Sequence, residues 1–167
     1  MKITVREERP GDIVAICALN SLAFGQEQEG QIVNALRRNA AAHLSLVAIV
    51  EGKIVGHILY SPATIGGLDG VALGPMAVHP DFQGKGIGSK LVEEGNARMK
   101  KEGCPFVIVL GHADYYPRFG FTPAGNFGIS CEWNVPDDVF MILVLDEARM
   151  RCVSGKALYR PEFSTVD

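Results

Sequence analysis

The sequence lacks the features that mark several large classes of protein. No apolar run approaches the ~20 residues that a helix needs to cross a bilayer, and no apolar segment of the signal-peptide kind opens the chain. We therefore expect a cytoplasmic protein without membrane contacts. Lys and Arg form no block and the net charge is -3, so nucleic acid is not an expected partner.

The cysteines do not form a metal-site pattern. Cys17, Cys104, Cys131 and Cys152 contain no C-x-x-C pair, and no His stands at metal-ligand spacing beside them. Cysteines of this kind are typically small buried apolar residues. We expect buried reduced thiols and no bound metal.

Repeats, low-complexity segments and linkers are also missing from the sequence. A length of 167 residues suits one domain with a sizeable core, and the hydrophobic fraction of 47% and charged fraction of 21% are ordinary for a globular protein. We expect a single domain over 1–167. Its core covers about 3–145, and a C-terminal extension follows over about 146–167.

The apolar pattern of the first half predicts one strand, two helices and a three-stranded antiparallel meander. A break at 24–26 separates the two helices; it lines a substrate entrance or is a plain connector. Glu51-Gly52 has the character of a two-residue hairpin turn, and 66–70 that of a looser turn. The predicted segments are a strand at 3–7, helices opening at 10–12 and covering 27–39, and strands at 44–50, 53–63 and 71–78.

The second half contains a helix between two apolar strands. The helix follows a glycine-rich turn at 83–90, stops at Gly103, and leads into a strand at 105–110. A crossover of this length implies a parallel pair of strands with a right-handed connection. The remaining predictions are a short helix within 111–121, a strand at 139–145 and a short strand at 155–159.

The glycine-rich turn, Gln83-Gly84-Lys85-Gly86-Ile87-Gly88-Ser89-Lys90, is the feature that points to chemistry. Backbone N–H groups at the start of a helix bind anions, phosphate above all. A P-loop requires G-x-x-x-x-G-K-[ST], and a dinucleotide fold requires G-x-G-x-x-G after a strand–helix repeat. The spacing by two of Gly84, Gly86 and Gly88 fits neither.

A third pattern does fit the turn. Gln83, Gly86 and Gly88 match Gln/Arg-x-x-Gly-x-Gly/Ala, and Val78-His79-Pro80 stands just upstream. With Tyr116-Pro117-Arg118-Phe119-Gly120-Phe121 downstream, where a Tyr precedes a Gly-Phe pair by four residues, the chain resembles the GCN5-related N-acetyltransferases (GNAT family), most of all its YhbS-like branch. The resemblance covers roughly 3–145.

The resemblance implies a fold and a co-substrate. The fold is an α/β (α+β) domain with a mixed, mostly antiparallel twisted sheet of about six to seven strands flanked by helices, in which a splayed parallel pair binds CoA. Acetyl-CoA is the implied co-substrate, with no metal. Its pantetheine arm would pair with the backbone of Met76, Ala77 and Val78, and its pyrophosphate would lie against the turn. The implied turn contacts are Gln83, Gly84, Lys85, Gly86, Gly88 and Ser89.

The resemblance also places Tyr116 at the position of the general acid and beside the cofactor. A Tyr hydroxyl, with an ordinary pKa of about 10, can protonate a thiolate leaving group whose thiol has a pKa of about 8.5. Tyr115 is adjacent and is expected to face the other way. Arg118 either binds an acidic group of the substrate or fixes the turn at 119–121.

The general base is less clearly marked, because Ala72 stands where many relatives carry a Glu on the motif-bearing strand. His112 follows the strand that should flank the thioester, and the ordinary pKa of an imidazole suits a base. His112 is therefore the base candidate, with Asp114, His79 and Glu27 as the remaining alternatives.

The expected function is transfer of an acetyl group from acetyl-CoA directly to an amine. The acceptor is a small-molecule or peptide amine, and the protein is a monomer or a homodimer. Two alternatives remain at this stage. One is a non-catalytic acyl-CoA-binding or sensing domain on the same fold, which the missing strand Glu favours. The other is a nucleotide-binding module without enzymatic activity.

Overall fold

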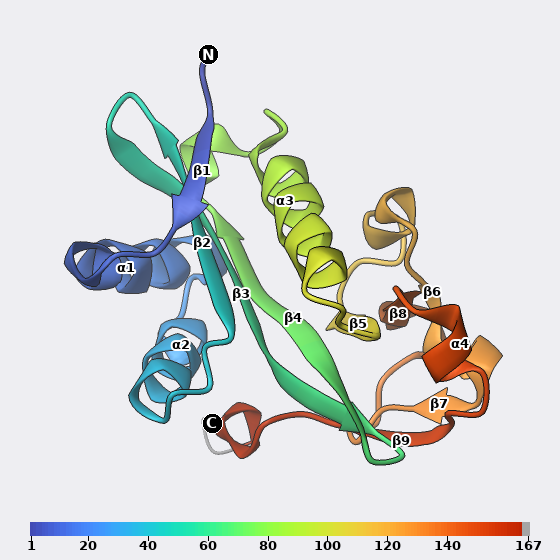
Figure 1. The fold of residues 1–167 in the computed structure, drawn as a ribbon. Helices are drawn as coiled ribbons and strands as arrows, with labels where there is room; N and C mark the ends of the chain where they lie inside the picture. Colours follow the sequence, from blue (N-terminus) through green and yellow to red (C-terminus); the bar gives the residue numbers. More distant parts are fainter. Residues whose placement is uncertain (165–167) are drawn as a thin grey trace.

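Apolar strand segments separated by tight turns give the first half of the chain an antiparallel meander (Figure 1). The computed structural model describes residues 1–164. The meander consists of β1 (Thr4–Glu7), β2 (Leu44–Val50), β3 (Lys53–Ile65) and β4 (Leu68–Val78).

The hairpin between β3 and β4 is tighter than the sequence predicted. Gly66 and Gly67 have φ of 56° and 83°, so they alone form the turn, as two residues with positive φ do in the favoured hairpin turns. The ladder therefore continues to the pairs Thr64–Asp69 and Ile65–Leu68, although the sequence predicts a loose turn over 66–70.

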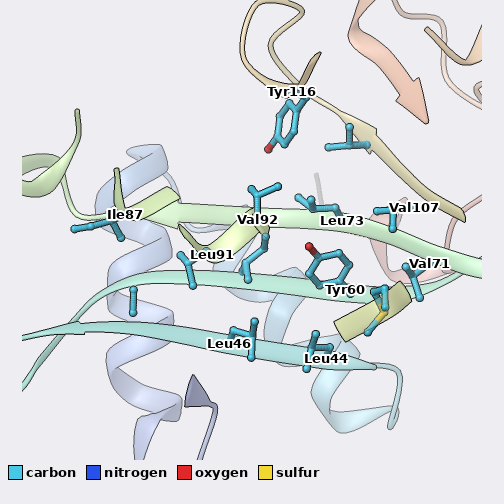
Figure 2. Close-up of a cluster of buried hydrophobic side chains, with 14 of the residues drawn as sticks. Leu44, Leu46, Tyr60, Val71, Leu73, Ile87, Leu91, Val92, Val107 and Tyr116 are labelled. Atoms are coloured by element: carbon cyan, nitrogen blue, oxygen red, sulfur yellow. The ribbon is translucent and has the colours of Figure 1, made fainter. Parts of the chain in front are cut away.

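Helices cover both faces of the meander. α1 (Ile13–Phe24) and α2 (Gln28–Arg38) pack on one face, and α3 (Ile87–Lys101) packs on the other (Figure 1). The alternation of β2 explains this, because Val47 joins the core under α1 and α2 while Leu46 and Ala48 join the core under α3. Figure 2 shows the second of these cores, in which Leu91 and Val92 of α3 lie in one cluster with Leu46 and Tyr60.

The second half of the chain extends the same sheet. β5 (Phe106–Leu110) lies parallel to β4, and β8 (Phe140–Val144) and the two-residue strand β6 (Thr122–Pro123) follow it in antiparallel order. The remaining elements are β7 (Ile129–Ser130), α4 (Glu147–Met150) and β9 (Gly155–Leu158). The described residues thus form nine strands rather than six or seven, because very short strands have no detectable pattern in sequence. The fold class is confirmed.

The predicted C-terminal extension is tied to the sheet. β9 pairs with the end of β3 through Thr64–Leu158 and Ile65–Ala157, and with β7 through Ile129–Gly155. A one-turn helix at 161–163 follows, and Glu162 accepts a 2.8 Å hydrogen bond from Asn39 at the end of α2. The last residues of the predicted extension, 165–167, lie outside the described residues.

The cysteines differ from the prediction of buried thiols. All four are free, as expected for reduced thiols, but Cys152 is exposed and Cys17, Cys104 and Cys131 are only partly buried. Cys152 follows the short helix α4 at the surface, where the local sequence offers no apolar stripe that would turn it inward.

The parallel pairing of β4 and β5 is short. It includes Val71–Val107, Ala72–Ile108 and Leu73–Val109, and then the two strands diverge. Beyond Leu73, residues 76–78 of β4 pair with β3 alone in the described chain. One edge of β4 therefore offers free backbone groups toward the gap.

Candidate active site

A cavity of about 740 Å³ lies at the divergence of β4 and β5. This size is typical of a small-molecule site. Its walls come from the end of β4, the glycine-rich turn, the segment after β5, the end of α1, the start of α2, the loop after β7 and the C-terminal extension. Predicted site residues in the lining are Met76, Val78, Gln83, Gly84, Gly86, Gly88, Ser89, His112 and Tyr116.

The glycine-rich turn leads into the N-terminus of α3. Gly86 is the N-cap residue with a φ of 82°, and it carries no side chain that could cap the first N–H groups. Gly84 also has a positive φ, of 75°. Glycine adopts this conformation without steric cost, so the turn can aim its backbone donors and the positive end of α3 at an anion.

Close packing connects the start of α3 to the segment after β5. A Cβ atom on Gly88 would lie only 2.9 Å from the hydroxyl oxygen of Tyr115, and the Ser89 hydroxyl is 3.4 Å from the same oxygen. Gly88 therefore allows the aromatic segment to approach the helix N-terminus.

Two predicted contact residues are absent from the cavity lining within the described chain. The Ala77 side chain is buried and points away, because the pleat of β4 presents Met76 and Val78 to the cavity instead. Lys85 lies over the ring of Phe82, with its Nζ atom 5.5 Å from the ring centroid. Gln83 lines the cavity and donates a 3.2 Å hydrogen bond to the carbonyl of Val78, which fixes the turn to the strand end.

Tyr116 is almost fully buried at the cavity wall, with 6% of its surface exposed. Figure 2 shows it at the edge of the core that contains Leu73 and Val107. Its ring packs edge-on against Phe121, with ring centroids 5.6 Å apart. Burial, and to a smaller extent the phenol of Tyr115, raises the pKa of Tyr116 well above its ordinary value. The hydroxyl therefore keeps its proton throughout the usual pH range.

Tyr115 does not face away from Tyr116, contrary to the prediction. Both line the cavity, with ring centroids 5.2 Å apart. The prediction assumed the alternation of an extended chain, but 116–119 form a 3-10 turn, in which neighbouring side chains are about 120° apart rather than opposite. Arg118 stacks on Tyr115 with its guanidinium carbon 4.7 Å from the ring centroid, consistent with a role in fixing this segment.

His112 lines the cavity and is exposed. Its carbonyl accepts the N–H groups of Tyr115 and Tyr116, at 3.1 and 3.3 Å, and so starts the turn that places both phenols. The alternative bases Asp114, His79 and Glu27 are absent from the lining of this cavity within residues 1–164.

Apart from Phe24 in the break at 24–26, the residues of the remaining wall were not predicted as a site. Phe24 lines it and is 42% exposed, which favours the entrance interpretation of the break at 24–26. These wall residues come from three distant segments of the chain, so no local spacing marks them. They are Phe24, Glu29, Ile32, Trp133, Tyr159 and Phe163.

The chain matches the family model of the acetyltransferase (GNAT) domain over residues 41–123. It is 41% identical to the uncharacterized N-acetyltransferase YjhQ of Escherichia coli (strain K12), over 76% of this chain and 74% of that protein. It is 31% identical to the uncharacterized N-acetyltransferase YhbS of the same strain, over 96% of this chain and 98% of that protein.

The chain belongs to the GNAT family of acetyltransferases. Its fold matches the crystal structure of the GNAT N-acetyltransferase YhbS from Escherichia coli in complex with CoA, with a TM-score of 0.94, 30% identity, and coverage of 98% of this chain and 93% of that one. It also matches a GNAT acetyltransferase from Brucella melitensis in complex with acetyl-CoA, with a TM-score of 0.81, 35% identity, and coverage of 97% and 98%.

Residues 1–164 contain no group of three or more His, Cys, Asp or Glu side chains placed to hold a metal ion. None of the helices in the same range has the length and apolar character required to span a bilayer.

Proposed function

We propose that this GNAT protein transfers the acetyl group of acetyl-CoA directly to an amine. The observation that carries the proposal is the cavity itself. A free strand edge, a helix N-terminus behind positive-φ glycines and a buried protonated tyrosine all meet there. The two similar structures with CoA or acetyl-CoA support the choice of co-substrate.

The residues that would hold acetyl-CoA follow from this arrangement. Met76, Ala77 and Val78 would pair with the pantetheine arm through their backbone, because this edge of β4 is free of β5. The turn would hold the pyrophosphate through Gly84, Gly86, Gly88 and Ser89, with Gln83 bracing the turn and Lys85 adding charge. The fit is good, because no side chain blocks the cap position at Gly86.

Acetyl-CoA supplies an electrophilic thioester carbonyl and a thiolate leaving group. Tyr116 would donate a hydrogen bond, and finally a proton, to the sulfur as negative charge develops there. His112 would accept a proton from the attacking amine, directly or through water, since it is the predicted base that reaches the cavity. Ala72 lies fully buried in the sheet, so this chain carries no carboxylate at that strand position.

An acceptor screen tests the proposal. Release of free CoA thiol from acetyl-CoA is followed with a panel of aliphatic, aryl and peptide amines, and calorimetry compares the binding of CoA with that of ATP. We expect amine-dependent thiol release and CoA binding. Tight ATP binding without CoA binding would refute the proposal in favour of a nucleotide-binding module. CoA binding without turnover on any amine would favour an acyl-CoA sensor.

Replacing Gly86 with Ala is expected to weaken CoA binding roughly tenfold. An alanine in the left-handed conformation costs about 1–2 kcal/mol, and the free turn can relax out of that conformation whereas the bound turn cannot. The dissociation constant is measured by calorimetry.

Gly52→Ala is the matched control for this substitution. Gly52 has a φ of 77°, and, like Gly86, it has no described atom within 4 Å of an added Cβ. It lies in the β2–β3 hairpin, so its substitution should cost similar stability but leave CoA affinity within about twofold of the wild type. Equal affinities for the two variants would show that the turn at Gly86 does not hold the cofactor.

A further inference from the structure

The cavity has two chemically different halves. Arg118 stacks on Tyr115, whose hydroxyl lies beside Ser89, so the cation belongs to the half that contains the glycine-rich turn. The other half is lined by aromatic and aliphatic side chains. Its members are Phe24, Ile32, Trp133, Tyr159 and Phe163, together with the carboxylate of Glu29.

The aromatic wall is held rigidly by the C-terminal extension. The ring of Tyr159 packs between Trp133 and Phe163, with centroid distances of 4.9 and 5.3 Å. The backbone N–H of Tyr159 donates a 2.8 Å hydrogen bond to the carboxylate of Glu132. The Glu162 carboxylate accepts hydrogen bonds from Arg160 and, at 2.8 Å, from Asn39 at the C-terminal cap of α2, so the wall is fixed to the helix that carries Glu29.

The hydroxyl of Tyr159 is a polar group without an internal partner. Its oxygen is completely buried, and no hydrogen-bond partner is found for it among residues 1–164. Burial, and to a smaller extent Cys131 and Glu132, raises the pKa of Tyr159. Because protein atoms cover this oxygen, Tyr159 contributes its ring rather than its hydroxyl to the cavity.

Glu29 gives this half of the cavity its charge. The carboxylate is half-buried in the first turn of α2, and Gln26 donates to both of its oxygens, at 2.8 and 2.9 Å. Among the described lining residues the other fully charged side chain is Arg118, on the cofactor side. An approaching acceptor therefore meets one negative charge and several aromatic faces.

We propose that this half selects a small cationic amine with an aryl or other flat apolar body. Glu29 attracts the ammonium group, and the rings of Trp133, Tyr159 and Phe163 bind the apolar body. The inference rests on the proposed acetyl transfer. The cavity volume, which must also hold the reactive arm of the co-substrate, favours a small acceptor.

Binding can be measured without catalysis, because Trp133 is the one tryptophan of the chain. We expect 2-phenylethylamine, added with CoA, to change its fluorescence at a concentration at least tenfold lower than ethanolamine or 3-phenylpropanoic acid. These two probes lack the aryl group and the positive charge, respectively. Equal or tighter binding of either one would overturn the proposal.

Variants separate the two recognition elements. Glu29→Gln should weaken 2-phenylethylamine binding about tenfold, because a hydrogen-bonded charge contact is lost. Glu27→Gln, two residues earlier and outside the cavity lining, should leave it unchanged. Phe163→Leu, which removes one ring of the aromatic wall, should weaken binding about threefold, whereas Tyr159→Phe keeps its ring and should leave binding within about twofold of the wild type. Equal effects of the two Glu substitutions would contradict a local contact at Glu29.

The binding test and the turnover test fail separately. If 2-phenylethylamine binds as expected but no amine is acetylated, the proposed transferase function fails, and only the selection of cationic aryl amines as ligands stands. If ethanolamine or a peptide amine is both bound more tightly and acetylated faster, the transferase function stands and the acceptor class is wrong.

Discussion

Replacing Tyr116 with Phe is expected to lower kcat about 100-fold or more while changing CoA affinity by less than about twofold. The substitution keeps the ring that packs on Phe121 and removes only the hydroxyl, which lies at the cavity wall. The phenol is the proposed donor to the departing sulfur, so the loss should appear in the chemical step. Steady-state kinetics and calorimetry with CoA measure the two quantities.

Tyr115→Phe is the comparison for this variant. Tyr115 lines the same cavity and its hydroxyl lies 3.4 Å from that of Ser89, so its loss should act on the cofactor side and reduce kcat less than tenfold. Equal losses of kcat in the two variants would show that neither phenol is a specific acid.

The raised pKa of Tyr116 also makes a prediction for the rate profile. Burial raises the pKa of Tyr116 well above the ordinary value of a tyrosine, so the phenol keeps its proton between pH 8 and about 10. Deprotonation of this acid should therefore not reduce the rate in that interval. A decline in that interval that disappears in Tyr116→Phe would contradict the assignment.

Acid should destabilise the protein through His57, by about 2 kcal/mol between pH 7 and pH 5. Burial, opposed by Glu8 and reinforced by Arg37, lowers the pKa of His57 from 6.5 to about 4. The unfolded chain therefore binds the proton more readily than the folded one. The stability contributed by neutral His57 is complete above pH 6.5 and is lost as the pH falls toward 4.

The surroundings of His57 fix its neutral form. Ser45 donates its hydroxyl proton to Glu8 at 2.8 Å, so its oxygen, 2.9 Å from Nε2, accepts the ring proton. Nδ1 then accepts from Asn20 at 3.3 Å. A second proton on Nδ1 would point at the amide donor of Asn20 and find no acceptor there. The cost of burying a charged imidazole is therefore not offset by a new hydrogen bond, and the pKa of His57 stays low.

Denaturant unfolding at pH 7 and pH 5 measures the acid effect. The free energy of unfolding of the His57→Gln variant should differ little between the two pH values, even if the variant is less stable than the wild type at both. His43→Gln, which alters an exposed imidazole 3.3 Å from Glu102, should retain it. The role of His57 is excluded if the wild type and His57→Gln lose equal stability between the two pH values.

The parts of the site that sequence could predict are those encoded by local spacing. The turn at 83–90 and the Tyr116 segment can be recognised from a few adjacent residues. Their glycines, which adopt positive φ, and the proline and glycine around Tyr116 restrict the backbone directly. The wall formed by Glu29 and Tyr159 is different. These residues are brought together by β9 pairing with β3 and by the contact of 161–163 with α2.

Local pattern also explains which elements were missed. β6 and β7 have two residues each, too few for any alternation to be visible, and they exist because β8 and β9 offer free edges to them. The relative direction of Tyr115 and Tyr116 depended on a 3-10 turn that proline permits but does not dictate.

The short ladder between β4 and β5 has a consequence for how the molecule unfolds. Three residue pairs join the two halves of the sheet, and beyond them an internal strand edge stays open. If the pantetheine arm completes that edge, co-substrate at 100 times its dissociation constant would add about 2.7 kcal/mol to stability. Cells depleted of CoA would then hold a protein with an open edge of the kind that promotes aggregation, and its abundance would follow the supply of CoA.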